Sequence, residues 1–378
     1  MNIKEAKQEV INTVKAYLEK DSTGDYLIPA VRQRPVLLMG PPGIGKTQIM
    51  EQVARECKIA LVAYTITHHT RQSAVGLPFI EKEEFGGKEY AVTEYTMSEI
   101  IASIYHKMRS TGLSEGILFI DEINCVSETL APTMLQFLQC KTFGSQAVPK
   151  GWIIIAAGNP PEYNKSVREF DMVTLDRVRR MDIEADYHVW KEYARKEQVH
   201  SALLSYLELR PKNFYRAEAD VDGLQFVTAR GWEDFSDLLK AYESLQFPVT
   251  QEIVYEFLRH ADVAEDVAAY LDLYRKYQDD YGIEGILQGD VSTEVYQRIS
   301  RAGFDEKISV TGLLLDGLLR KMAAFCWEKE LTDAWYLYLK EYRSQIGQAK
   351  DAKECYLSLL KQEEEAFGQK KTAGLYTR

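Results

Sequence analysis

A glycine-rich segment near the start of the chain constrains the fold more than any other part of the sequence. It reads Gly40-Pro41-Pro42-Gly43-Ile44-Gly45-Lys46-Thr47. The apolar residues 35–39 before it predict a buried strand, and residues 47–54 after it predict the beginning of a helix. Glycines between a strand and a helix let backbone N–H groups close around a phosphate group at the helix N-terminus. The segment therefore predicts a phosphate-binding loop.

The residue types in this loop predict a nucleoside triphosphate as the ligand. Lys46 is expected to reach the β- and γ-phosphates, and the Thr47 hydroxyl is expected to ligate Mg²⁺. An ordinary glycine and proline turn is the alternative, but the flanking strand and helix argue against it. We assign the whole loop and the next residue to nucleotide binding: Gly40, Pro41, Pro42, Gly43, Ile44, Gly45, Lys46, Thr47 and Gln48.

Composition narrows the class of protein. A length of 378 residues predicts two or three domains, and a hydrophobic fraction of 46% is sufficient for real cores. The formal net charge of -11 argues against a protein that neutralises nucleic-acid phosphates over a broad surface. Neither a signal peptide nor an apolar stretch long enough to span a membrane is evident, so we expect a cytoplasmic location.

The two halves of the chain show different hydrophobic patterns. Residues 3–20 have helical spacing, and three later runs of β-branched and apolar residues predict strands at 59–64, 116–120 and 152–157. Strands that alternate with helices predict a parallel sheet covered on both faces. From about Asp186 onward we expect only amphipathic helices.

Polar residues follow two of these strands. Asp121 and Glu122 come after one strand, at the edge where open α/β sheets bind ligands. We expect Asp121 to hold Mg²⁺ and Glu122 to polarise the attacking water. Asn159 follows another strand and is expected to orient that water or contact the γ-phosphate. The alternatives are an acidic helix cap for the carboxylates and an ordinary turn for Asn159.

Taken in order, these motifs over residues 30–275 resemble the AAA+ ATPases, and their detail resembles the MoxR/dynein-related branch. Asp121-Glu122-Ile123-Asn124 fits that branch. Residues 75–95 look like the β-hairpin that the branch inserts into its second helix, and residues 141–150 look like another hairpin. The resemblance implies an AAA+ P-loop core with a parallel five-stranded sheet between helices at residues 1–185 and an all-α lid at 186–278. The amphipathic pattern predicts a further helical extension at 279–378, which contains no motif of the family.

The resemblance also implies two arginines with roles at the nucleotide. Arg177 stands where the branch places an arginine finger, which acts on the nucleotide of a neighbouring subunit. Arg179 and Arg180 are close enough to be alternatives, and a basic surface cluster is a further reading. Arg230 lies in a segment similar to the lid motif that starts a helix, where it would contact the γ-phosphate. The alternative for Arg230 is a surface arginine.

The function implied is a ring-forming ATPase, a hexamer, that uses ATP and Mg²⁺ to remodel a protein partner. In that branch the partner commonly bears a von Willebrand factor A domain. A DNA-directed motor or a restriction-type nucleotidase is the alternative enzyme, but the first insert contains Glu81-Lys82-Glu83-Glu84 and is acidic. A nucleotide-dependent scaffold that hardly hydrolyses ATP is the alternative without catalysis, and Glu122 argues against it.

Overall fold

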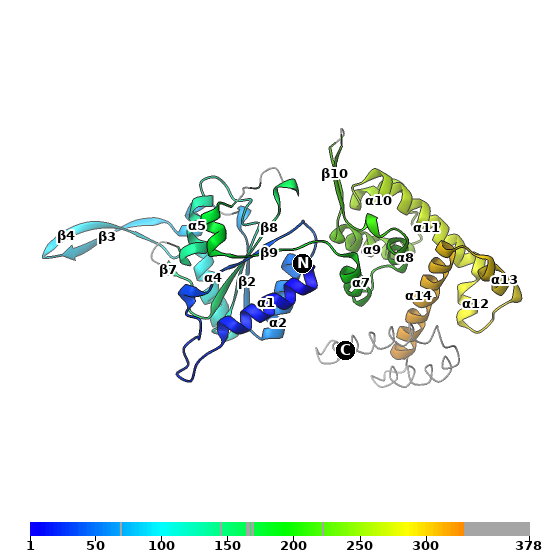
Figure 1. The fold of residues 1–378 in the computed structure, drawn as a ribbon, viewed down its shortest axis with the longest axis horizontal. Helices are drawn as coiled ribbons and strands as arrows, with labels where there is room; N and C mark the ends of the chain where they lie inside the picture. Colours follow the sequence, from blue (N-terminus) through cyan, green and yellow to red (C-terminus); the bar gives the residue numbers. More distant parts are fainter. Residues whose placement is uncertain (69, 144–145, 164–166, 168–169, 221–222, 329–378) are drawn as a thin grey trace. The chain divides into compact units, whose positions relative to one another are not determined.

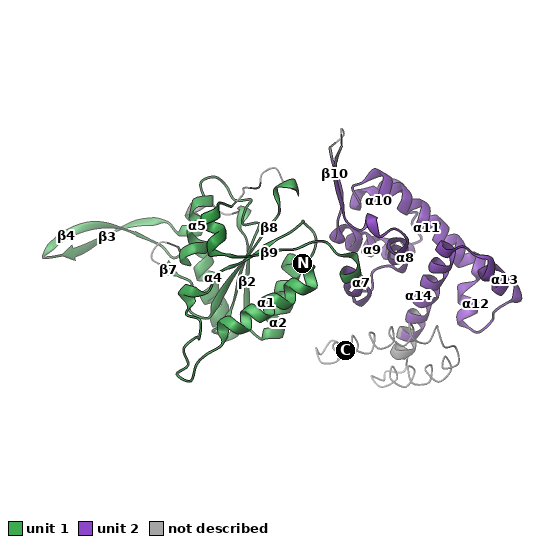
Figure 2. Cartoon of the chain, viewed as in Figure 1, with its two compact units in different colours: residues 1–189 green, residues 190–378 purple. Residues whose placement is uncertain are grey.

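The chain forms two compact units. The computed structural model describes residues 1–68, 70–143, 146–163, 167, 170–220 and 223–328. The first unit spans Met1–Val189 and the second spans Trp190–Arg378, so the boundary falls inside helix α7 (Tyr187–Lys196) (Figure 2). The predicted division of the second unit into a lid and an extension remains a prediction.

A five-stranded parallel sheet forms the centre of the first unit. Its order is β2-β5-β8-β1-β9, and every neighbouring pair is parallel. The central strand β8 is buried along its whole length, which explains why it reads as a continuous apolar run. The predicted sheet is thus confirmed, with strands β1 (Val36–Met39), β2 (Ala60–Thr65), β5 (Gly116–Asp121), β8 (Trp152–Gly158) and β9 (Arg179–Asp182).

Helices cover both faces of this sheet (Figure 1). On strand β5, Leu118 and Ile120 belong to one core with residues of α4 and α5. Because side chains alternate along a strand, Ile117 and Phe119 point to the opposite face, which α1 and α2 cover. The first unit contains η1 (Ala30–Arg32), η2 (Ile66–His68), η3 (Pro161–Tyr163), α1 (Ile3–Leu18), α2 (Lys46–Cys57), α3 (Arg71–Val75), α4 (Glu99–Thr111), α5 (Ala131–Cys140) and α6 (Met172–Arg177).

Both predicted hairpins are present in the first unit. The antiparallel strands β3 (Pro78–Phe85) and β4 (Lys88–Tyr95) extend away from the sheet (Figure 1). Their turn is Gly86-Gly87, and both residues have a positive φ that glycine adopts without steric cost. The second hairpin joins β6 (Thr142–Phe143) to β7 (Gln146–Ala147).

The second unit is mainly helical but also contains an antiparallel hairpin. Strands β10 (Arg216–Asp220) and β11 (Gly223–Val227) correct our expectation of helices alone after about residue 186. Most of the side chains that the structure describes in this hairpin are exposed or half-buried, so the strands do not form an apolar run that sequence reading could find. The other elements are η4 (Pro211–Asn213), α8 (Ser201–Leu209), α9 (Ala229–Ser244), α10 (Gln251–Phe257), α11 (Ala261–Tyr281), α12 (Ile283–Leu287), α13 (Thr293–Arg301) and α14 (Phe304–Glu328).

Buried aromatic side chains fill the core of the second unit. Trp232 is fully buried, and its indole N–H donates to the carbonyl oxygen of Phe214 at 3.0 Å. The Tyr206 hydroxyl donates to the Asp266 carboxylate at 2.8 Å, and the Tyr270 hydroxyl lies 2.8 Å from Ser309 Oγ. Each polar end thus has a partner, as burial requires. In the part of the chain that the structure describes, no helix is long and apolar enough to cross a membrane.

Candidate functional site

The glycine loop connects β1 to α2, and its backbone requires glycine. Gly43 and Gly45 have φ of 74° and 92°, in the left-handed region that other residues rarely adopt. A Cβ on Gly40 would lie 2.7 Å from the carbonyl oxygen of Ile183, so Gly40 allows the close approach of two chain segments. The loop therefore has the curved backbone that a phosphate cradle needs.

The Lys46 side chain is buried inside this loop. Its ammonium donates to the carbonyl oxygens of Gly40 and Pro41 at 2.7 Å and 2.8 Å, and to Asn159 Oδ1 at 2.9 Å. Lys46 and Asn159 are far apart in the sequence, yet strands β1 and β8 are neighbours in the sheet. The structure thus brings two predicted site residues into direct contact.

The two predicted metal residues also meet. Thr47 Oγ1 donates to Asp121 Oδ2 at 2.7 Å, and the other carboxylate oxygen of Asp121 accepts from the backbone N–H of Glu122 at 2.9 Å. A hydroxyl and a carboxylate are hard oxygen donors of the kind that Mg²⁺ binds while it keeps several waters. The donor set therefore fits the predicted ion.

Glu122 has an unusual backbone conformation. Its φ of 56° is left-handed, which costs a residue other than glycine roughly 1–2 kcal/mol. Its carboxylate accepts a hydrogen bond of 3.0 Å from Thr67 Oγ1 in η2, just beyond the end of β2. Sequence reasoning missed Thr67. The available signal was its position, because β2 is next to β5 in the sheet and residues that follow both strands meet at one edge.

Asn124 fixes the backbone of Asn159. Its side chain is buried, donates to the Asn159 carbonyl oxygen at 2.7 Å and accepts from the Asn159 N–H at 3.3 Å. We predicted Asn124 only as part of a motif, without a role. These two bonds hold the residue that contacts Lys46.

The three candidate finger arginines have different surroundings. Arg177 is exposed at the end of α6 and donates to the neutral amide of Gln139 on α5. Arg179 lies on β9 and pairs with Glu9 of α1, where hydrogen bonds from Asn12 and Arg179 hold the pKa of Glu9 below its usual value. Arg180, also on β9, pairs with its own strand neighbour Asp182 at 2.7 Å. Arg179 and Arg180 are thus both engaged with carboxylates of their own unit.

Arg230 belongs to the second unit. Helix α9 begins at Ala229, and the Thr228 side chain caps it by accepting from the N–H of Gly231 at 3.2 Å. The predicted helix start is therefore present, with Arg230 exposed in its first turn. In the first unit the structure brings together Lys46, Thr47, Asp121, Glu122 and Asn159, while Arg177 lies apart from them on α6.

Comparison with known families adds an independent finding. Residues 36–182 match the model of the ATPase family associated with various cellular activities (AAA). The match runs from β1 through β9, so it covers the whole five-stranded sheet and every site residue of the first unit. No curated protein matches the chain.

We refer to residues 36–182 as the AAA domain. Together, the family match and the sheet order identify the fold as an AAA+ P-loop core followed by a mainly helical unit. The match supports ATP binding and ATP hydrolysis as the activity of this domain. It does not distinguish between branches of the AAA+ ATPases.

Proposed function

We propose that this protein is a ring-forming, Mg²⁺-dependent ATPase of the MoxR type that remodels or matures a partner protein. One observation carries the catalytic part of the proposal. Residues from the ends of four neighbouring segments of the AAA domain form hydrogen-bonded pairs at one edge of its sheet: Lys46 with Asn159, Thr47 with Asp121, and Glu122 with Thr67.

Lys46 and the loop amides would bind the triphosphate. The Lys46 ammonium already has three acceptors, and phosphate oxygens would take their place with a stronger, charge-assisted bond. Thr47 and Asp121 would hold Mg²⁺, which neutralises charge on the phosphate oxygens. Asn159, released by Lys46 and held by Asn124, could then turn its amide toward the γ-phosphate or the attacking water.

Glu122 would act as the general base. The water oxygen forms a bond to the γ-phosphorus, the bond from that phosphorus to the bridging oxygen breaks, and ADP leaves. The water proton passes to the Glu122 carboxylate. Thr67 is a positioning residue in this scheme, because its hydrogen bond fixes where that carboxylate points.

The ring is proposed from the arginines. AAA proteins commonly assemble into rings, and Arg177 is the candidate finger because it is exposed and its partner is neutral. We propose a hexamer in which Arg177 acts on the neighbouring subunit's nucleotide. Arg230, in the first turn of α9, would contact the γ-phosphate from a lid at 186–278, and 279–378 would be an extension of that lid.

The nature of the partner is proposed from the inserted hairpin. Five glutamates and two lysines lie between Pro78 and Tyr95, so this projecting surface is acidic and does not suit nucleic acid. A protein with a von Willebrand factor A domain is the partner that the MoxR resemblance suggests. We also propose a cytoplasmic location for this protein.

ATP turnover by the purified chain tests the enzyme. Glu122→Gln should lower turnover by about 10²–10⁴-fold and leave ATP binding intact, since only the base is lost. Glu51→Gln, an exposed glutamate on α2, is the matched control and should retain turnover. An unchanged rate for Glu122→Gln would remove this residue from its role.

The same variant tests the partner. ATP should remain bound to Glu122→Gln, so the variant should retain a partner during purification in an ATP-dependent manner. Capture of a protein with a von Willebrand factor A domain would support the proposal. Acceleration of wild-type turnover by DNA, with no response to the captured protein, would instead favour a DNA-directed motor.

A further inference from the structure

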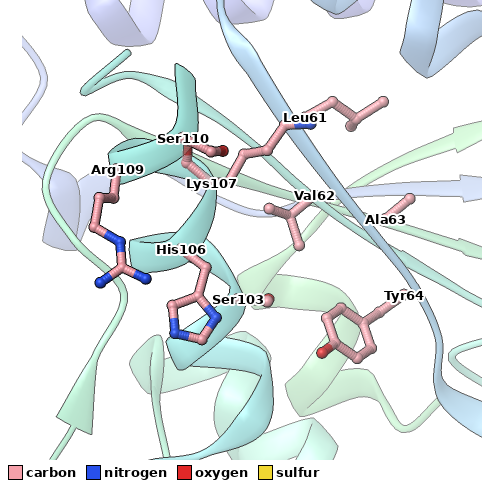
Figure 3. Close-up of a pocket in the computed structure, with 9 residues that line it drawn as sticks. All are labelled: Leu61, Val62, Ala63, Tyr64, Ser103, His106, Lys107, Arg109 and Ser110. Atoms are coloured by element: carbon pink, nitrogen blue, oxygen red, sulfur yellow. The ribbon is translucent and has the colours of Figure 1, made fainter. Parts of the chain in front are cut away.

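An open groove of about 690 Å³ lies along the edge of the AAA domain's sheet. Leu61, Val62, Ala63 and Tyr64 of β2 line one side, and residues of α4 line the other (Figure 3). Side chains alternate between the two faces of a strand, so a groove that touches four consecutive residues follows the edge of the strand itself. No residue proposed for ATP hydrolysis lines this groove.

Strand β2 has a free edge facing outward. It is the first strand in the sheet order and pairs only with β5 in the part of the chain that the structure describes. The N–H of Ala60 donates to Glu115 beside β5, and in a parallel ladder alternate residues bond to the same neighbour. The backbone groups of Leu61, Ala63 and Thr65 therefore point away from β5, where they can pair with an additional strand.

The helix side of the groove is basic. Ser103, His106, Lys107 and Ser110 are spaced so that they share one face of α4, and Arg109 lies beside them. In Figure 3, Lys107 extends from α4 toward β2. Among the described residues, neither Lys107 nor Arg109 forms an ion pair with a carboxylate, so these charges are available to a ligand.

We propose that this groove binds an acidic peptide segment in extended conformation, which adds to the sheet as a strand beside β2. The added strand would lie about 4.8 Å from β2 and accept main-chain hydrogen bonds from its edge, and the cations of α4 would select carboxylates on alternate residues. A free edge of alternating N–H and C=O groups matches a peptide backbone and not a phosphodiester, which favours peptide over nucleic acid. The site is independent of ATP hydrolysis.

Fluorescence anisotropy of a labelled peptide of alternating glutamate and valine, with the full chain and no nucleotide, tests the charge requirement. We expect saturable binding that Lys107→Glu weakens by about tenfold or more, equal to 1.4 kcal/mol. Arg55→Glu makes the same charge change on an exposed residue of α2 and should alter the affinity less than about twofold. Absence of binding, or equal loss in both variants, would overturn the proposal.

N-methylated versions of the peptide test the strand pairing. Methylation of one alternate set of amides removes the N–H groups that face β2, whereas methylation of the other set leaves them intact. One set should therefore lower the affinity by about tenfold or more and the other should not. Equal affinity of both versions and the parent peptide would contradict strand addition.

One folding control and two competition measurements complete the test. Circular dichroism shows whether Lys107→Glu folds, and Lys107→Gln, which should also weaken binding, replaces it if it does not. Displacement of the peptide by a single-stranded oligonucleotide of equal charge would assign the groove to polyanions and overturn the proposal. Displacement as the protein's own concentration rises would assign it to a second copy of the chain, with the same consequence.

Discussion

The AAA domain and the second unit place their polar side chains in opposite ways. In the AAA domain they lie together at one edge of the sheet. Asp121 ends β5, Glu122 follows it, and Lys46 begins the helix after the glycine loop. In the second unit they lie inside the core, where pairs such as Tyr206–Asp266 and Tyr270–Ser309 connect different helices. Polar groups at a sheet edge are accessible to a ligand, whereas those in the helical core stabilise packing.

This difference predicts that substitutions in the two units will affect different measurements. Changes at the sheet edge should alter rates with little effect on the free energy of unfolding. Changes to the core pairs should alter the free energy of unfolding and leave the chemistry intact.

The largest expected effect comes from Arg177→Ala. If Arg177 is the finger, ATP turnover should fall by about 10³-fold or more, because charge developing on the phosphoryl group loses its partner. Stability should not change, since the side chain is exposed. Arg180→Ala, at an exposed arginine of β9 three positions further along the chain, is the control, and turnover is measured for both. A greater loss in Arg180→Ala would assign the finger to Arg180 instead.

The next effect is on stability in the second unit. Trp232→Ala should lower the free energy of unfolding by about 3–5 kcal/mol, because a fully buried indole leaves a cavity. Tyr296→Ala on α13, where the residue is 63% exposed, should change the free energy of unfolding by less than about 0.5 kcal/mol. Denaturant unfolding monitored by circular dichroism measures both. Comparable losses would show that this core does not depend on Trp232.

A smaller effect is expected at Thr67. Thr67→Val removes the hydrogen bond to the Glu122 carboxylate, and a bond to a charged group is worth about 1.5–3 kcal/mol. We expect kcat to fall about tenfold to a hundredfold with KM unchanged, because the base is no longer positioned. Thr67→Ser keeps the hydroxyl and should restore kcat. Failure of this rescue would point to a packing role for Thr67.

Tyr270→Phe tests the prediction for the second unit, because it removes only the hydroxyl oxygen of one core pair. Loss of the hydroxyl that bonds to Ser309 should lower the free energy of unfolding by about 0.5–1.5 kcal/mol and leave ATP turnover unchanged. Burial raises the pKa of Tyr270 to about 12, so this contribution should persist through neutral pH. A change in turnover without a change in the free energy of unfolding would contradict the prediction that core pairs of the second unit affect stability alone.

The smallest effect concerns Lys141. This lysine is a partly buried polar group of the AAA domain that lies away from the proposed nucleotide site, so it is an exception to the comparison between the two units. Burial lowers the pKa of Lys141 from 10.5 to about 8, and its ammonium donates to the carbonyl oxygen of Ala30. Between these values the unfolded chain holds the proton and the folded chain has released it, so stability at this site rises with pH.

Lys141→Met should therefore remove part of the rise in stability between about pH 8 and pH 10, as measured by denaturant unfolding at each pH. Lys150→Met, at an exposed lysine nearby, should leave the rise unchanged. Identical pH dependence in wild type and Lys141→Met would show that Lys141 keeps its ordinary pKa.

The sequence predicted the AAA+ core because its inner strands β1, β5 and β8 are buried on both faces and its loop needs specific glycines. Strand β9 was not located, because Arg179-Arg180-Met181-Asp182 lies at an edge and only Met181 is buried there. The hairpin β10–β11 was missed for a similar reason, since Val227 is the one buried side chain among those that the structure describes in it. Strands that bury few of their side chains are thus not predicted from the hydrophobic pattern of the sequence.

Within the candidate site, the residues of the motifs were predictable, but the residues that hydrogen-bond to them and orient them were not. Lys46, Thr47, Asp121 and Glu122 belong to short motifs whose chemistry fixes the residue types. Thr67 and Asn124 act through a single hydrogen-bond partner each, and contacts between segments far apart in the sequence require the sheet order. Only the fold reveals which residues orient the motif.

In the proposed site, Lys46 would also determine which ligands the loop accepts. An ammonium has three N–H donors, and the carbonyl oxygens of Gly40 and Pro41 together with Asn159 already accept three hydrogen bonds from it. A ligand must therefore offer more than a hydrogen-bond acceptor to displace them. If Lys46 has its proposed role, neutral or singly charged molecules would leave the internal bonds in place, while a polyphosphate would replace them with stronger ones. The loop would then exclude weak ligands before hydrolysis begins.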